Sequence, residues 1–370
     1  MLLNSMSRSL ANGAVSTLLV VAYCSSCCQV NDAKGAGAQA YELTGDASGT
    51  HDPSIIKEGD TWYVFASGND PKGGHIPIRC SKDLIAWKHC GSVFAKLPDW
   101  VANDQGVPNT KGIWAPDISY FDGKFHLYYA YSLFGKNTSG IGLATNVTLD
   151  PSRPNYKWID EGFVLRSVAT DDFNAIDPNL VIDKGGQTWL DFGSFWSGIK
   201  MRQIDRASGK LSSKDQTLYS LATRAKPDNV APAAPNLPPD WEAVEAPFIV
   251  MHAGSYYLFV SWDLCCRGVK STYHTMVGRA RSITGPYLDQ DGTPMSKGGG
   301  SEVLKANETW VGPGGGSVLL GVHNDPDIIV YHAYDAITGK PSLQISTLAW
   351  TDGWPRAAVI NIKRAAAEAK

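Results

Sequence analysis

The sequence predicts an all-β protein, a five-bladed β-propeller that forms a single domain. Two observations carry this prediction: a proline-containing phrase recurs five times at nearly equal intervals, and an aromatic-rich strand follows it. The recurring prolines are Pro53, Pro116, Pro178, Pro247 and Pro313, separated by 63, 62, 69 and 66 residues. An interval of this length holds several strands, so each repeat is one supersecondary unit.

The interior of each unit supports this interpretation. Twelve residues after the first four prolines stand large apolar residues: Phe65, Tyr128, Leu190 and Phe259. The fifth unit reaches its equivalent, IIVYHAYD, later because HNDPD is inserted. Short strands rich in β-branched and aromatic residues alternate with Gly, Asp and Asn turns, and no segment shows a convincing helical pattern.

A radial arrangement of such sheets removes long exposed edges, which is why the repeat predicts a propeller. An open solenoid is the alternative, but its repeats are usually shorter, roughly 20 to 50 residues.

The composition describes a globular protein with an uncharged partner. The 370 residues include 43% hydrophobic and 10% aromatic residues, enough to bury a large core. The formal net charge is −3, and no basic stripe is available to neutralise phosphates. We therefore expect no nucleic-acid partner.

The first residues are typical of an export signal. Arg8 precedes an apolar run, Ala14–Ala22, that is too short for a transmembrane anchor. We predict a signal peptide at 1–30, a linker at 31–40, the propeller at 41–364 and a tail at 365–370. The protein is expected to be secreted or extracytoplasmic and monomeric. A lipid anchor on Cys24, Cys27 or Cys28 is the alternative, although the residues before Cys24 fit such a site poorly.

The remaining cysteines form two pairs. Cys80 and Cys90 lie ten residues apart, and in an oxidising compartment they can join the two strands of a hairpin. Cys265 and Cys266 are adjacent, a spacing that matches no common zinc pattern. We expect this second pair to be free buried thiols.

Acidic residues stand at the openings of three repeats. Asp52 and Asp177 directly precede a repeat proline, and Glu245 lies one residue further from its own. Since the innermost strands of a propeller begin at one end of its axis, these three side chains are expected to meet in one cavity. The alternative is that an acid before proline only caps a turn. Asp117 follows its proline and is therefore expected to be structural.

Clustered carboxylates repel one another, which raises at least one pKa and lets an acid and a base coexist at neutral pH. Glycoside hydrolysis needs this pair: one group protonates the leaving oxygen, and the other activates water or attacks carbon. Groups on opposite blades can supply the wider separation that inversion uses, so inversion is expected.

Six motifs resemble one known family. The segments HDPS, WAPD, AIDPNLV, GSFWSGI, VEAPFI and SWDLCCRGVKSTYHTMVGRA together resemble family 43 glycoside hydrolases, and among these the endo-α-1,5-L-arabinanases. The resemblance runs from about Tyr41 to Ile362. It implies a five-bladed propeller that hydrolyses arabinan or arabino-oligosaccharides of plant cell walls by inversion, with Asp52 as general base and Glu245 as general acid. Asp177 would tune the pKa of the acid and orient the substrate, while Asp52 would be ionised.

The resemblance also implies binding residues. Trp114, Phe134 and Trp196 match arabinanase subsite positions, and aromatic rings suit the apolar faces of a furanose. His51 is expected to bond locally or to line the site. His332, in IVYHAYD, would hold a calcium ion together with waters, although a buried histidine bonded to main chain is the alternative. Glycines 314–316 replace a histidine-containing GPGHN pattern, so subsite details are expected to differ.

Three functions remain open from the sequence. An endo-arabinanase is favoured, and an exo-acting arabinofuranosidase or β-xylosidase on the same scaffold is the nearest alternative. A carbohydrate-binding propeller without catalysis would need the aromatic residues but not the acids.

Overall fold

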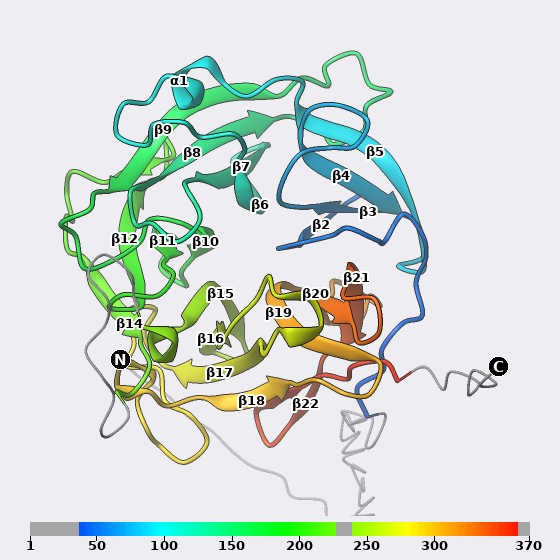
Figure 1. Ribbon diagram of the computed structural model, residues 1–370, viewed down its shortest axis with the longest axis vertical. Helices are drawn as coiled ribbons and strands as arrows, with labels where there is room; N and C mark the ends of the chain where they lie inside the picture. The colour runs from blue at the N-terminus through cyan, green and yellow to red at the C-terminus, as the bar shows by residue number, and fades with distance from the viewer. Residues whose placement is uncertain (1–36, 227–238, 362–370) are drawn as a thin grey trace, which may run out of the picture. The chain divides into compact units, whose positions relative to one another are not determined.

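A computed structural model describes residues 37–226 and 239–361, which form five sheets arranged radially around one axis (Figure 1). The predicted all-β propeller with five blades is confirmed. The expected signal peptide and C-terminal tail, and the linker up to residue 36, lie outside the described residues. Within the described ranges, no helix combines the length and apolar character needed to cross a bilayer.

Each blade consists mainly of antiparallel strands that follow one another along the chain. Blade one has β2 (Ser54–Glu58), β3 (Thr61–Phe65), β4 (His75–Ser81) and β5 (Ala86–Phe94), with β1 (Thr44–Gly45) parallel to β5. Blade two has β6 (Trp114–Phe121), β7 (Lys124–Tyr131), β8 (Ser139–Asn146) and β9 (Ile159–Ser167). Blade three has β10 (Asn179–Ile182), β11 (Thr188–Phe192), β12 (Ile199–Asp205), β13 (Lys210–Leu211) and β14 (Tyr219–Ala222).

The last two blades follow the same plan. Blade four has β15 (Val244–His252), β16 (Ser255–Trp262), β17 (His274–Ala280) and β18 (Ser301–Leu304). Blade five has β19 (Trp310–Leu319), β20 (Ile328–Asp335) and β21 (Pro341–Thr347), and a hairpin of β22 (Ala349–Thr351) and β23 (Trp354–Arg356) follows it. The described helices are short: α1 (Asp99–Ala102) and the 3₁₀ helices η1 (Asp240–Glu242), η2 (Gly268–Lys270) and η3 (Met295–Lys297).

The proline repeat marks the entry into each innermost strand. Directly before the first four repeat prolines, the chain takes a left-handed conformation, with φ of 47° at Asp52, 42° at Ala115, 55° at Asp177 and 51° at Ala246. Residues other than glycine adopt this conformation only where the surrounding structure enforces it. The repeated kink gives Asp52 and Asp177 equivalent places at one end of the axis.

Hydrogen bonds from main chain to side chain join neighbouring blades, four of them between innermost strands and one from β19 to Ser261 of β16. A polar side chain on one blade accepts the amide of the next: Ser54 from Ile118 (3.1 Å), Asp117 from Leu180 (2.8 Å), Asn179 from Ile249 (2.8 Å), Ser261 from Gly315 (2.8 Å) and Ser317 from Ile55 (3.1 Å). These five bonds cross all five blade interfaces. Asp117 is therefore a structural residue, as expected from its place after the proline.

The hydrophobic core is divided into layers between adjacent blades. One layer, for example, packs Ile55 and Val64 of blade one against Val330 and Ile345 of blade five. The same interface is closed by the chain's early residues, because the Tyr41 amide donates to Ile345 O (2.9 Å) and the Leu343 amide donates to Ala47 O (2.8 Å). The two ends of segment 39–48 thus pair with β21 at the outer edge of blade five, while β1 between them pairs with β5 of blade one. Blade five therefore includes two residues assigned above to the linker.

The two cysteine pairs are both disulfide-bonded. Cys80 and Cys90 join β4 to β5, which confirms the predicted pairing within a hairpin. Cys265 and Cys266 are also bonded to each other, so the expectation of free thiols was wrong. Adjacent cysteines can pair where the loop holds their main chain in a suitable turn, and Cys266 has a left-handed φ of 64°. The sequence spacing does not reveal that turn.

Asp117 should make stability depend on pH. Burial raises its pKa from 3.8 to about 6, so the folded protein binds this proton more tightly than the unfolded chain does. Its contribution is therefore lost as the pH rises through about 6 and grows as the pH falls, by about 1.5 kcal/mol between about pH 7.5 and 5. Asp117→Asn should remove this increment, because an amide can still accept from Leu180 and donate to Ser54.

Urea unfolding of the wild type and Asp117→Asn at both pH values measures the difference. A constant gap between the two free energies of unfolding would contradict the prediction.

Candidate active site

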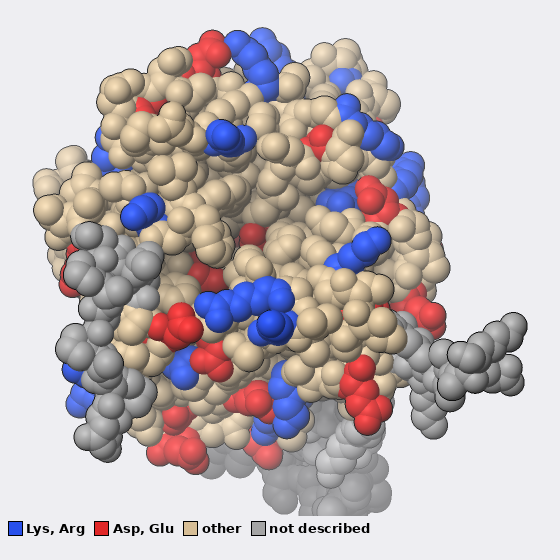
Figure 2. Space-filling model, viewed as in Figure 1, with Lys and Arg blue, Asp and Glu red and all other residues tan. Residues whose placement is uncertain are grey.

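A cavity of about 520 Å³ opens at the end of the axis where the innermost strands begin. Its lining includes all three predicted catalytic acids, Asp52, Asp177 and Glu245, which come from blades one, three and four. The surface is hollowed at this place, and acidic atoms are visible inside the hollow (Figure 2). The structure therefore brings the three carboxyls into one cavity, as the repeat predicts.

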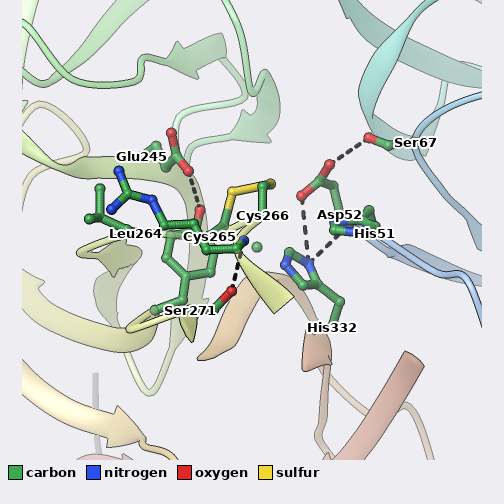
Figure 3. Close-up of a disulfide and its surroundings, with 12 residues drawn as sticks. His51, Asp52, Ser67, Glu245, Leu264, Cys265, Cys266, Ser271 and His332 are labelled. Atoms are coloured by element: carbon green, nitrogen blue, oxygen red, sulfur yellow. Dashed lines mark hydrogen bonds and ion pairs between the residues drawn. A yellow bond between two sulfur atoms is a disulfide. The ribbon is translucent and has the colours of Figure 1, made fainter. Parts of the chain in front are cut away.

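Asp52 is held by groups from blades one and five. The Ser67 hydroxyl donates to Asp52 Oδ2 at 2.6 Å, and the Asp52 amide donates to His332 Nδ1 at 3.2 Å (Figure 3). The carboxyl keeps 31% of its side-chain surface exposed. Burial raises its pKa, while the charge of His51 and the Ser67 hydrogen bond lower it. Asp52 is thus a fixed carboxyl with solvent access on one side.

Glu245 is fixed by two hydroxyl groups. Tyr273 donates to Oε1 at 2.7 Å and Ser194 donates to Oε2 at 2.6 Å. Burial raises the pKa of Glu245, the two hydrogen bonds lower it, and the nearby charge of Asp52 raises it. Both carboxylate oxygens have a donor, so the side chain has one preferred orientation.

Asp177 has a different environment. Its Oδ2 accepts one amide, that of Ala246, at 3.0 Å. Burial raises the pKa of Asp177 well above its usual value, and the charges of Glu245 and Asp52 raise it further. Glu245 receives two hydroxyl donors whereas Asp177 receives a single amide, so hydrogen bonds offset less of the effect of burial at Asp177.

The four predicted substrate-binding residues also line the cavity. They are His51, Trp114, Phe134 and Trp196. Phe134 is 82% exposed, so a ligand can cover its ring. Beyond Trp114 and Phe134 lies a second cavity of about 430 Å³, lined also by Asn69, Asn109 and Lys111. The two cavities share five lining residues and together extend the hollow beyond the acids.

His51, Asp52 and His332 form a group whose candidate ligand atoms all lie within 4.8 Å of one another. His332 is fully buried, and burial holds its pKa well below the usual value, so the imidazole is neutral. Gly315 leaves space here, because a Cβ on it would lie 2.8 Å from Asp52 Oδ1 and 2.9 Å from His332 Nδ1. A carboxylate and two imidazoles beside an open space fit a divalent cation whose shell is completed by water.

Sequence reasoning missed the residues that position the acids. These are Ser67, Ser194, Tyr273 and Tyr334. A signal was available for the serines, because a serine stands at or just after the end of the second strand in the first four blades, at positions 67, 132, 194 and 261. No comparable regularity marks Tyr273 or Tyr334, which lie on strand and loop segments that differ between blades.

Comparison with known proteins identifies the family of the chain. Residues 47–355 match the model of the glycosyl hydrolases family 43. The chain belongs to this family. The resemblance derived from the six motifs is confirmed, and the protein is a glycoside hydrolase.

Relatives of this family 43 enzyme carry names of two kinds, endo-acting and exo-acting. It is 44% identical to the extracellular endo-α-(1→5)-L-arabinanase 1 of Bacillus subtilis, over 82% of this chain and 86% of the relative. It is 41% identical to the extracellular exo-α-(1→5)-L-arabinofuranosidase of Cellvibrio japonicus, over 83% of this chain and 85% of the relative. A solved structure, the endo-arabinanase of Bacillus licheniformis, is 45% identical with a TM-score of 0.73, covering 85% of this chain and 99% of that one.

Proposed function

We propose that this family 43 hydrolase is a secreted arabinanase that cleaves internal α-1,5-L-arabinofuranosidic bonds of arabinan with inversion. The observation that carries the proposal is the meeting of three carboxyls from separate blades in one cavity lined by aromatic rings. Two relatives that are more than 40% identical over the aligned residues are named for α-(1→5)-L-arabinan or arabinofuranoside cleavage, and both are named extracellular.

The proposed mechanism assigns one task to each acid. Glu245, oriented by Tyr273 and Ser194, gives its proton to the bridging oxygen of the leaving sugar. Asp52, oriented by Ser67, takes a proton from the water that attacks the anomeric carbon. Asp177 lies next to Glu245, and the charges of the two carboxyls raise one another's pKa. Asp177 thereby favours the protonated form of Glu245 that the reaction needs.

Endo action is supported by the extent of the hollow. The second cavity continues beyond Trp114 and Phe134, which gives a polymer room to pass the acids on that side. Exo action is the second candidate, because the 41% identical relative from Cellvibrio japonicus carries an exo name.

The products of linear arabinan distinguish the two candidates. Endo action should give a mixture of oligosaccharides from the first minutes, together with a rapid fall in viscosity. A single small product from the start would establish exo action instead. Proton NMR of the first product should show the β-anomer if the α-linkage is cleaved with inversion, and an initial α-anomer would contradict that part of the proposal. Debranched arabinan should be hydrolysed and xylan should not.

Replacing the two acids should separate their roles. Glu245→Gln should lower kcat on arabinan by at least about 10³-fold while sugar binding remains, since the amide cannot donate the proton. An aryl arabinofuranoside, whose leaving group needs little protonation, should restore part of this activity. Asp52→Asn should stay inactive on both substrates, because water activation is still required. Rescue of Asp52→Asn by the aryl substrate would reassign that residue.

We further propose that His332, with waters, holds a calcium ion beside Asp52. Once bound, the ion would supply a positive charge that favours the ionised form of Asp52. The described residues contribute one carboxylate and two imidazoles, so most of a calcium shell would be water.

Chelation tests the calcium site. Treatment with EDTA should lower both activity and Tm, and calcium should restore them because an ion bound only to the folded state stabilises it. Calorimetric titration should detect binding to the wild type and none to His332→Ala. Equal activity and Tm before and after chelation, with no metal left by elemental analysis, would contradict the site.

A further inference from the structure

The Cys265–Cys266 disulfide lies on the rim of the main cavity. Leu264, Cys265, Cys266 and Arg267 all line this cavity from the loop between β16 and β17. In the close-up, the disulfide lies between Glu245 on one side and Asp52 and His332 on the other (Figure 3). Cys265 is half-buried and Cys266 is exposed, so sulfur and Cβ atoms form part of the wall that a ligand meets.

The same loop is connected to the groups that hold both proposed reacting acids. The Cys266 amide donates to the Tyr334 hydroxyl at 2.8 Å. That hydroxyl lies 3.3 Å from His332 Nε2 and 3.5 Å from His51 Nδ1, and His332 Nδ1 in turn accepts the Asp52 amide. At its far end the loop leads into Tyr273, which donates to Glu245.

The main chain at the disulfide is constrained. Cys266 has a φ of 64°, which a residue other than glycine keeps only when its surroundings enforce it. A bond between adjacent side chains closes a small ring that contains their shared peptide, so it restricts rotation at this position. Further bonds hold the rest of the loop: Arg267 N donates to Ser271 Oγ at 3.0 Å, and Leu264 N donates to Thr272 Oγ1 at 3.2 Å. Opening the disulfide removes the only covalent constraint on Cys266.

We propose that the Cys265–Cys266 disulfide is a substrate-positioning element of this hydrolase, which forms an apolar wall for a furanose ring and fixes Tyr334 beside His51 and His332. The proposal rests on the arabinanase function proposed above. Sulfur is polarisable and apolar, and it suits the C–H face of a sugar, while aromatic residues of blades two and three line the cavity as well. The disulfide is therefore part of the binding surface, and arabinan binds more weakly when the disulfide is reduced to two thiols.

A dithiol reductant should reduce the Cys265–Cys266 disulfide. One thiolate of the reductant attacks a cysteine sulfur, the sulfur–sulfur bond breaks, and a mixed disulfide forms. The cysteine that was not attacked leaves as a thiolate in this step. The second thiol of the reductant then attacks the reductant's own sulfur in the mixed disulfide and releases the attacked cysteine. Two electrons pass from the dithiol, which ends as a cyclic disulfide, to the protein, which ends with two thiols.

The chain offers a matched control in its other described disulfide. We would compare the wild type, Cys265→Ser/Cys266→Ser and Cys80→Ala/Cys90→Ala on linear arabino-oligosaccharides, measuring kcat, KM and Tm. Loss of the Cys265–Cys266 bond should raise KM by about fivefold, the size expected for one hydrogen bond or contact, with a smaller change in kcat. Loss of the Cys80–Cys90 bond, remote from the cavity, should lower Tm and leave KM unchanged.

Reduction repeats the test without changing residues at the site. Dithiothreitol should raise KM of Cys80→Ala/Cys90→Ala to the level of Cys265→Ser/Cys266→Ser, and should not alter the latter. Tyr334→Phe should reproduce part of the increase, and opening the disulfide in that variant should add less than it adds to the wild type. Mass spectrometry after alkylation would verify the bond in each sample.

The outcomes separate the two proposals. An active wild type whose KM is the same with the disulfide open and closed would overturn the positioning role and leave the arabinanase function intact. An increase of KM only in parallel with a fall in Tm across all variants, the control included, would also overturn it. A properly folded, oxidised wild type without activity on arabinan would overturn both.

Discussion

A ring of hydrogen bonds between neighbouring blades is the interaction on which the rest of the structure depends. Each of the five bonds joins a buried side chain of one blade to a main-chain amide of the next, where water cannot substitute. The apolar layers between blades supply most of the burial, but they are not directional. The hydrogen bonds set the height of each strand along the axis, and the positions of the acids follow from that height.

This constraint explains why the cavity can hold three carboxyls. Strands fixed at one height begin at one level, and the left-handed residue before each proline gives that level a repeated geometry. Buried acids that lie close together raise one another's pKa, as Asp177 shows. Their repulsion would push the carboxyls apart if the strands that carry them could move. A closed ring resists the repulsion because moving one acid away requires its whole blade to move.

The fold and the acids could be predicted from the sequence because both repeat. The prolines recur at the starts of the innermost strands, and Asp52 and Asp177 each stand directly before one of these prolines. The supporting hydroxyls were missed because their partners are distant in the sequence: Tyr273 donates to Glu245 on β15 of blade four, and Tyr334 of blade five accepts from Cys266 of blade four. The Cys265–Cys266 bond was missed for a related reason: adjacent thiols pair or stay free according to the turn of a loop, and that turn is set by distant partners. Which acid keeps a proton likewise depends on donors such as Ser194.

Residues 39–48, whose two ends complete blade five, have a consequence for how the protein assembles. A ribosome makes this segment before any blade, yet its partners on β21 emerge almost three hundred residues later. The two ends of segment 39–48 must therefore stay unpaired until synthesis is nearly finished. Closure of the propeller ring is for this reason a late and cooperative step of folding. Deleting these residues would leave β21 of blade five with unpaired main-chain groups at the edge of its sheet. Aggregation through this edge would follow even though every residue of the cavity is intact.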